Sequence, residues 1–456
     1  MLVDPRMMLS SQRYYIAAVV LFVVWSTLYL SGTLHHSTEP TTFGNFARKP
    51  ELSTKDNLRS QDVLRDAITT VFKTIKVYPT QEYYRDPKGK AWTAAPSNSS
   101  TWTEPLGKKV LIVDIDTRVP TGDNQILQPD AKIDWERLES GGAGLVSHAI
   151  TNHYLYALIH GYEYRYFQAA NMPDHHATWI KPHIFKEVLP DYQFMVFMDA
   201  DVVISHLEVP LEWMFNRWGI EEHTSIALPH DTEEFVNGKS ISTDSKGVPV
   251  LNTGFIVTQN NKLTFEMLEA WGNCTTEVRY PGCARWKGEW SHEQRAFSEY
   301  IRYDFGRIPG TIVGIPCDDA MGYPGFKAQN EAKGNNGVSD CNGNFLRHYT
   351  LGKDQVHQGG TNTMAQALAE VLQKSVVSMQ DQIIIKESDP SSNVAWEDQS
   401  IPKQAWEVDE DEEDLETAED DEEGPLVSDL KKTTDSKLET DREKKISLLL
   451  AGKVSK

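Results

Sequence analysis

Phe194-Met-Val-Phe-Met-Asp199-Ala-Asp201-Val-Val-Ile204 is the stretch that decides the fold. Its apolar residues 194–198 are too few for a helix and suit a strand buried on both faces, as in a parallel sheet covered by helices. Charge is costly inside such a strand, so Asp199 and Asp201 are expected where it ends, at the edge where open α/β sheets bind ligands. Alternate strand residues point the same way, so both carboxylates can bind one divalent cation. A solvated turn is the alternative.

Apolar runs and helical periods around this strand predict an α/β domain. A first buried strand is expected at 110–114, and Asp114 at its tip is a candidate contact for a ribose or base. The order strand, helix, strand, helix, strand is typical of a doubly wound, mostly parallel sheet with right-handed crossovers. The other expected strands are 162–167, 225–228, 250–257, 311–316 and 344–349, and the helices are 147–160 with Ser147 as N-cap, 178–188, 211–218, 263–271, 293–303 and 364–379.

The N-terminus carries the longest apolar segment. Residues 14–34 contain no charged side chain and are long enough to cross a bilayer. Arg6 and Arg13 precede this segment, so residues 1–13 are expected in the cytoplasm and the rest on the lumenal side. We therefore predict a transmembrane signal anchor. The polar residues 35–105 are interpreted as a stem, with an early part of the domain as the alternative.

The charge is concentrated at the other end of the chain. The formal net charge is −21, and residues 397–423 contain 15 acidic residues and one Lys. Such a run repels itself and predicts a disordered acidic tail at 381–456, after a domain at 106–380. No basic patch interleaved with aromatic residues occurs, so a nucleic-acid partner has no support.

The four cysteines fit an oxidising lumen. Cys274, Cys283, Cys317 and Cys341 can form two disulfides in three connectivities, and pairing between sequence neighbours, 274–283 and 317–341, is preferred. Asn98 and the Asn273-Cys-Thr sequon are candidate glycosylation sites.

Six short motifs occur within residues 108–375: Asn152-His-Tyr-Leu-Tyr-Ala-Leu-Ile-His-Gly-Tyr162, Trp179-Ile-Lys181, Phe197-Met-Asp-Ala-Asp201, Leu251-Asn-Thr-Gly-Phe255, His292-Glu-Gln294 and His348-Tyr-Thr-Leu-Gly-Lys353. In this order they resemble the motifs of glycosyltransferase family 34, the fungal galactosyl/mannosyltransferase and plant xylosyltransferase group. The chain departs from the family's pattern at Met198, where an aromatic residue is usual, and at His292-Glu293, where two acids are usual. The resemblance implies a GT-A, Rossmann-like nucleotide-diphospho-sugar transferase domain.

The same resemblance implies roles for individual residues. Asp199, Asp201 and His348 would bind a divalent cation, and mixed oxygen and nitrogen ligands suit Mn²⁺. Glu293 and Gln294 would lie beside the donor sugar and stabilise developing positive charge. The nucleotide sugar would contact Asp114, Lys181, Asp199, Asn252, Gly254, Gly352 and Lys353.

The sequence thus predicts a metal-dependent, retaining glycosyltransferase that moves galactose or mannose from UDP-galactose or GDP-mannose to a glycan acceptor. The expected location is the Golgi membrane, as a single-pass type II protein with a lumenal domain, and a glycosyltransferase complex is a candidate partner. Two alternatives stay open. One is a non-catalytic subunit of such a complex, and the other is a tethered protein whose acidic tail binds a basic partner.

Overall fold

The computed structural model describes residues 55–385, except 95–99, 234, 237–238, 323–325, 333 and 335–339. The chain divides into two units, residues 1–63 and 64–456, and the elements below that position the site belong to the second. The predicted anchor, the sequon at Asn98 and nearly all of the predicted tail lie outside the described residues. Within the described ranges, no helix combines the length and the apolar character needed to cross a membrane.

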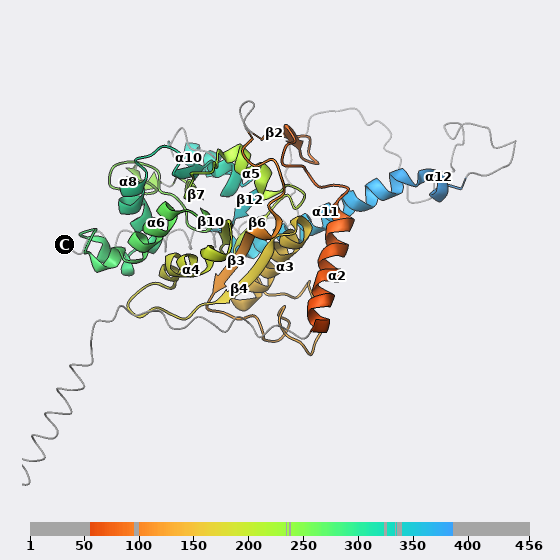
Figure 1. The fold of residues 1–456 in the computed structure, drawn as a ribbon, viewed down its shortest axis with the longest axis horizontal. Helices are drawn as coiled ribbons and strands as arrows, with labels where there is room; N and C mark the ends of the chain where they lie inside the picture. The colour runs from red at the N-terminus through yellow and green to blue at the C-terminus, as the bar shows by residue number, and fades with distance from the viewer. Residues whose placement is uncertain are drawn as a thin grey trace, which may run out of the picture. The chain divides into compact units, whose positions relative to one another are not determined.

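A six-stranded sheet in the order β11-β7-β10-β5-β3-β4 forms the centre of the second unit (Figure 1). β3 pairs in parallel with β4 and β5, and β11 with β7, whereas β10 runs antiparallel between β5 and β7. The mostly parallel α/β sheet that the sequence predicted is therefore confirmed. The strands are β3 (Val110–Asp116), β4 (Glu163–Gln168), β5 (Phe194–Met198), β7 (Ile226–Pro229), β10 (Phe255–Gln259) and β11 (Ile312–Ile315).

Helices cover both faces of this sheet, because alternate strand residues point in opposite directions. On β3, Val110 packs in a core shared with α3 (Gly142–His160), and the next residue, Leu111, packs with α4 (Ile180–Val188) and α6 (Lys262–Gly272). Both side chains are fully buried. Truncating Leu111 to alanine is expected to cost about 2–5 kcal/mol of unfolding free energy.

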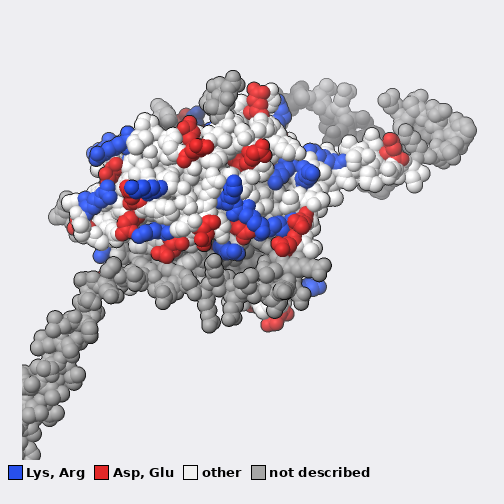
Figure 2. All heavy atoms as spheres, viewed as in Figure 1, with Lys and Arg blue, Asp and Glu red and all other residues white. Residues whose placement is uncertain are grey.

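The remaining elements surround this core or extend its edges. Figure 2 shows basic and acidic side chains interspersed over one face of the protein. These elements are α2 (Lys55–Phe72), β1 (Tyr83–Arg85), β2 (Ala91–Thr93), β6 (Val202–Ile204), α5 (Leu211–Trp218), β8 (Phe235–Val236), β9 (Lys239–Ser240), α7 (His292–Ala296), a π-helical turn (Phe297–Ile301), α8 (Arg302–Phe305), α9 (Cys317–Ala320), α10 (Phe326–Ala332), β12 (Leu346–His348), α11 (Val356–Ser378) and α12 (Gln380–Ile383).

Part of the predicted stem belongs to the domain. Phe72, Tyr84, Trp92 and Trp102 are buried in the core that contains β3, and Trp102 packs edge-on against Phe194 with ring centroids 5.0 Å apart. The hairpin β1–β2 buries only the central residue of each strand, so the sequence around its aromatic residues is polar. The domain therefore begins before residue 106, as the alternative reading of this segment allowed.

Two predicted element boundaries are corrected. Helix α3 begins at Gly142, five residues before the expected cap, and Ser147 lies inside it with its hydroxyl donating to the Ala143 carbonyl. The strand expected from residue 250 begins only at Phe255. Ahead of it, the side-chain oxygen of Asn252 accepts a hydrogen bond from the Gly254 amide at 2.8 Å. Such a local side-chain bond competes with strand pairing and turns the chain.

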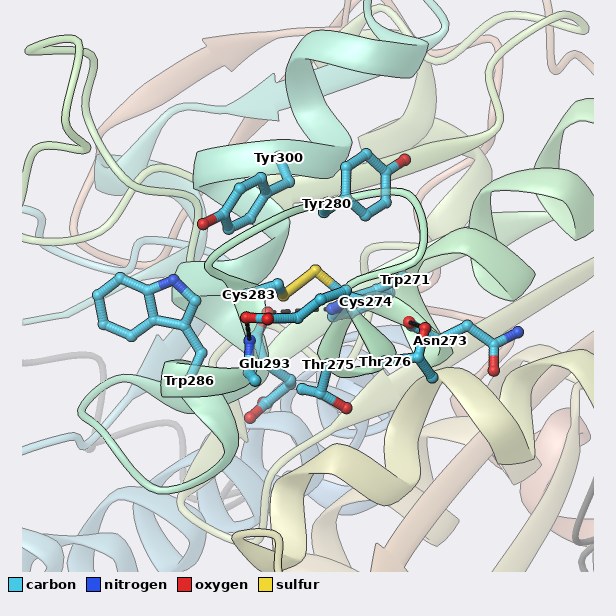
Figure 3. The surroundings of a disulfide bond; sticks show 12 residues. Trp271, Asn273, Cys274, Thr275, Thr276, Tyr280, Cys283, Trp286, Glu293 and Tyr300 are labelled. Carbon is cyan, nitrogen blue, oxygen red and sulfur yellow. Dashed lines mark hydrogen bonds between the residues drawn. A yellow bond between two sulfur atoms is a disulfide. The ribbon is translucent and has the colours of Figure 1, made fainter.

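Both preferred disulfide pairings are confirmed. Cys274 is bonded to Cys283 and Cys317 to Cys341. The first bond is buried and joins two short 3₁₀ turns, 274–276 and 283–287. Figure 3 shows this bond among aromatic side chains, with Trp271 and Glu293 close by.

Candidate active site

Strand pairing brings the predicted metal ligands together. Asp199 and Asp201 lie in the turn between β5 and β6. β12 pairs antiparallel with β6 so that His348 lies opposite Val202, beside the second carboxylate. His348 Nε2 is 3.3 Å from Asp201 Oδ1 and 4.0 Å from Asp199 Oδ2. One ligand atom from each of the three residues lies within 4.8 Å of the others, as a shared metal ion requires.

Gly254 makes room for this cluster. The Asp199 amide donates to the Gly254 carbonyl at 2.7 Å, which ties the two strand ends together. A Cβ on Gly254 would lie 2.1 Å from His348 Cε1 and 2.6 Å from its Nδ1. Only glycine therefore lets the imidazole occupy its observed position, which is the close approach that an isolated glycine in a strand sequence indicates.

The cluster is suited to a divalent cation. Asp201 and His348 are buried, and in the part of the chain that the structure describes His348 Nδ1 has no hydrogen-bond partner. Burial alone would raise the pKa of Asp201, but His348 and Lys353 outweigh burial and hold that pKa well below its usual range. The carboxylate is therefore ionised at neutral pH. Two carboxylates and an imidazole form a donor set that Mn²⁺ accepts.

Lys353 supplies a positive charge next to the Asp201 carboxylate. Its Nζ lies 2.7 Å from Asp201 Oδ2, while about half of the side chain stays exposed. Burial lowers the pKa of Lys353, but the Asp201 carboxylate more than compensates and the pKa is raised. Gly352 precedes it in the left-handed conformation, with φ of +74°, which turns the chain so that Lys353 follows directly.

Lys181 holds two carboxylates instead of offering a free charge. Its buried Nζ donates to the Thr253 carbonyl at 3.0 Å and lies 3.1 Å from Asp199 Oδ1 and 3.3 Å from Glu293 Oε1. An ammonium has three donors, so these oxygens use all of them. Burial lowers the pKa of Lys181, but Asp199 and Glu293 together raise it above its usual value. Lys181 therefore positions these two carboxylates, while its contact with the donor stays a prediction.

Glu293 and Gln294 lie in the first turn of α7 and are both anchored. Thr253 Oγ1 donates to Glu293 Oε1 at 2.9 Å, and Thr178 donates to the other carboxylate oxygen. The Thr253 amide donates to Gln294 Oε1 at 3.1 Å. Trp271 Nε1 donates to the Glu293 carbonyl at 3.0 Å, so this turn rests on the aromatic layer around the Cys274 disulfide (Figure 3).

Asp231 joins the predicted residues from the next loop. Its Oδ1 accepts from Asn252 Nδ2 at 3.2 Å and its Oδ2 from Gln294 Nε2 at 2.9 Å. The amides of Asn252 and Gln294 are thereby oriented by one carboxylate. Sequence reasoning missed Asp231, which lies in the loop after β7.

Asp114 does not reach the site. Its carboxylate accepts from Tyr164 at 2.5 Å and lies 2.7 Å from His153 Nδ1, beneath helix α3. The strand runs two residues further than expected, so Asp116 stands at its end. Asp116 lines the cleft and forms a two-point ion pair with Arg118, at 2.8 and 2.6 Å. The sequence signal that could have identified Asp116 is its place among the polar residues that follow the apolar run 110–113.

A cleft of about 550 Å³ contains every predicted site residue except Asp114, Gly254 and Gly352. A larger hollow, of about 790 Å³, is lined by the β1–β2 hairpin and α11 and contains none of them. We place the candidate site in the smaller cleft, because it combines the carboxylate and histidine cluster with exposed cations. Its lining includes Asp116, Arg118, Gly142, His176, Thr178, Lys181, Asp199, Asp201, Asp231, Asn252, Thr253, Trp290, His292, Glu293, Gln294, His348 and Lys353.

The family comparison agrees with this site. Residues 131–306 match the galactosyl transferase GMA12/MNN10 family, and this stretch contains β4, β5, β10, α7 and both aspartates. By this match the chain is a glycosyltransferase. Among curated proteins none matches the chain.

Solved structures of other glycosyltransferases are similar at low identity. A glycosyltransferase involved in glycosylating the major capsid of PBCV-1 is 15% identical, with 55% of this chain and 98% of that chain covered and a TM-score of 0.34. Mouse xyloside xylosyltransferase 1 is 11% identical, with 53% and 98% covered and a TM-score of 0.31. The galactosyltransferase LgtC with donor and acceptor sugar analogues is 14% identical, with 57% and 95% covered and a TM-score of 0.29.

Proposed function

We propose that this chain is a metal-dependent, retaining glycosyltransferase that moves a hexose, galactose or mannose, from a nucleotide sugar to a glycan acceptor. The observation that carries the metal dependence is the cluster of Asp199, Asp201 and His348 within 4.8 Å. These residues come from the β5–β6 turn and from β12, far apart in sequence. UDP-galactose and GDP-mannose are the donors that we propose.

The metal ion and the cationic side chains of the cleft would have different roles. A bound cation, which we propose to be Mn²⁺, would neutralise the donor diphosphate and stabilise it as a leaving group. Lys353 and Arg118 keep exposed side chains, about 54% and 42%, and can meet the diphosphate directly. Lys181 is buried and holds Asp199 and Glu293 in place.

The acidic and amide groups of α7 would act on the sugar. Glu293 receives hydrogen bonds from two threonines and an ammonium, so its carboxylate is fixed in orientation. A fixed carboxylate beside an anomeric carbon stabilises developing positive charge without moving during the reaction. Gln294 is oriented by Asp231 and by the Thr253 amide, and it would share this role.

The location remains part of the proposal. Two disulfides in the domain favour an oxidising compartment, and we propose a single-pass type II protein of the Golgi membrane with this domain in the lumen. A glycan acceptor and a glycosyltransferase complex are the proposed partners.

The test is Asp201→Asn in the full-length protein, with exposed Asp191→Asn as matched control. Asparagine keeps the size but removes the charge, so binding of a nucleotide sugar by titration calorimetry should lose its dependence on Mn²⁺, and sugar transfer should be lost. Asp201→Asn also loses the charged contacts to His348 and Lys353, so urea unfolding measures the lost stability and binding is assayed at a temperature where the variant is folded. Mn²⁺-dependent donor binding that survives in Asp201→Asn would refute the proposed metal site.

A further inference from the structure

Two stacked histidines lie in the cleft outside the proposed metal group. His176 precedes the 3₁₀ turn Ala177–Trp179, and His292 begins α7. Their ring centroids are 3.7 Å apart and the rings are inclined by only 6°. Both residues line the cleft, as does Trp290, whose ring meets the His292 ring edge-on at 5.7 Å. The family that this sequence resembles usually has an acid at the position of His292. The histidine pair is therefore a departure of this chain from the family's pattern.

The pair is held in place by backbone contacts. The His176 amide donates to the Lys287 carbonyl at 2.8 Å, and the His292 amide donates to the Glu289 carbonyl at 2.8 Å. His176 Nδ1 is also bonded to Thr178 Oγ1 at 3.0 Å. The rings are therefore positioned before any ligand arrives, which lowers the ordering cost of binding.

Of the two rings, His292 carries no charge at neutral pH. Burial, and then the neighbouring His176, lower the pKa of His292 to about 4. His292 Nδ1 is buried and has no hydrogen-bond partner among the described residues. His176 is exposed, so the face of its ring that points away from His292 is left to serve a ligand.

The chemistry of this end of the cleft differs from that of the metal group. A diphosphate requires positive charge, and the cationic side chains Lys353 and Arg118 are exposed in the same cleft. Stacked aromatic rings offer an apolar face with polar atoms at their edge, which suits the ring of a neutral sugar with its C–H face and surrounding hydroxyls. Thr178 links His176 to Glu293, so a sugar on the stack would lie beside the proposed reaction centre.

We propose that His176 and His292, with Trp290 at their edge, form the subsite that binds a neutral pyranose of the glycan acceptor by stacking. This inference rests on the proposed function and assigns the acceptor side of the same cleft. His176 is the contact residue, and His292 supports it from behind.

Two substitutions at His176 separate stacking from positioning. His176→Asn keeps a side-chain group that can bond to Thr178 but removes the ring, whereas His176→Phe keeps the ring and removes the bond. The first should raise the acceptor KM about 10-fold, the scale of one aromatic contact. The second variant should keep an acceptor KM near that of the wild type.

Direct binding of methyl α-mannopyranoside and methyl galactopyranoside, measured by saturation-transfer NMR on the full-length protein, gives a readout that needs no turnover. Binding that is lost in His176→Asn and kept in His176→Phe supports the subsite. Equal binding in wild type and both variants, or loss in His176→Phe alone, overturns it. Exposed His223→Ala is the control. Donor hydrolysis in the wild type reports on the proposed function separately, so the two failures are distinguishable.

Discussion

Gly254→Ala tests whether the approach of His348 to the two aspartates matters. The added Cβ would lie 2.1 Å from His348 Cε1, whereas ordinary contact begins near 3.4 Å, so the imidazole has to retreat by about 1.3 Å. A displacement of about 1 Å in a catalytic constellation costs roughly 100-fold in rate. We expect a loss of about that size in kcat/KM, together with 10- to 100-fold weaker Mn²⁺ binding.

The same substitution overpacks the core, which typically costs about 1–3 kcal/mol of unfolding free energy. Urea unfolding measures that cost, and activity is assayed at a temperature where the variant is folded. Gly288→Ala is the matched control, since its Cβ would meet no atom within 4 Å. His348→Ala added to Gly254→Ala should restore stability but not Mn²⁺ binding. Wild-type Mn²⁺ affinity in Gly254→Ala alone would refute the reasoning.

Three further predictions concern stability. Lys181→Met leaves two carboxylates without their buried cation, so the unfolding free energy should fall by about 3–5 kcal/mol in urea. Because the pKa of Lys181 is raised in the fold, the stabilisation by its ammonium should be complete below a pH of about 10 and be lost as the pH rises further. A urea midpoint that stays constant as the pH rises through this range would contradict the prediction. Replacing Cys274 and Cys283 with Ser should cost about 2–3 kcal/mol in thermal unfolding and lower kcat, while an unchanged melting temperature would contradict a stabilising role. Burial, and then His357, lower the pKa of His148 to about 4, so stability should fall as the pH drops from about 6.5 toward 4. His148→Phe should flatten that slope of urea midpoint against pH, and an unaltered slope would count against it.

The metal turn could be predicted because its signal is local. Five buried apolar residues followed by Asp199 and Asp201 are contiguous in sequence, and strand periodicity places both carboxylates. His348 could not be derived in this way. Its position depends on the pairing of β12 with β6, a contact over more than a hundred residues, and only the family resemblance pointed to it.

The sequence-based predictions that the structure corrects failed for physical reasons. Asp114 was expected at a strand tip, but the two residues Ile115 and Asp116 continue the pairing with β4. The hairpin in the predicted stem was missed because each of its strands buries only one side chain, such as Trp92 in β2. Lys181 was placed correctly, but its saturation by three oxygens depends on tertiary contacts that sequence does not specify.

The ammonium of Lys181 is shared between Asp199 and Glu293, and this sharing makes the two ends of the cleft thermodynamically linked. A divalent ion at Asp199 competes with the ammonium for the same carboxylate, and the ammonium can then shift its interaction toward Glu293. Linkage is reciprocal, so whatever strengthens the bond between Lys181 and Glu293 must favour the ion by the same factor. If the proposed ion binds at Asp199, its affinity would therefore depend on the contact between Lys181 and Glu293 at the other end of the cleft.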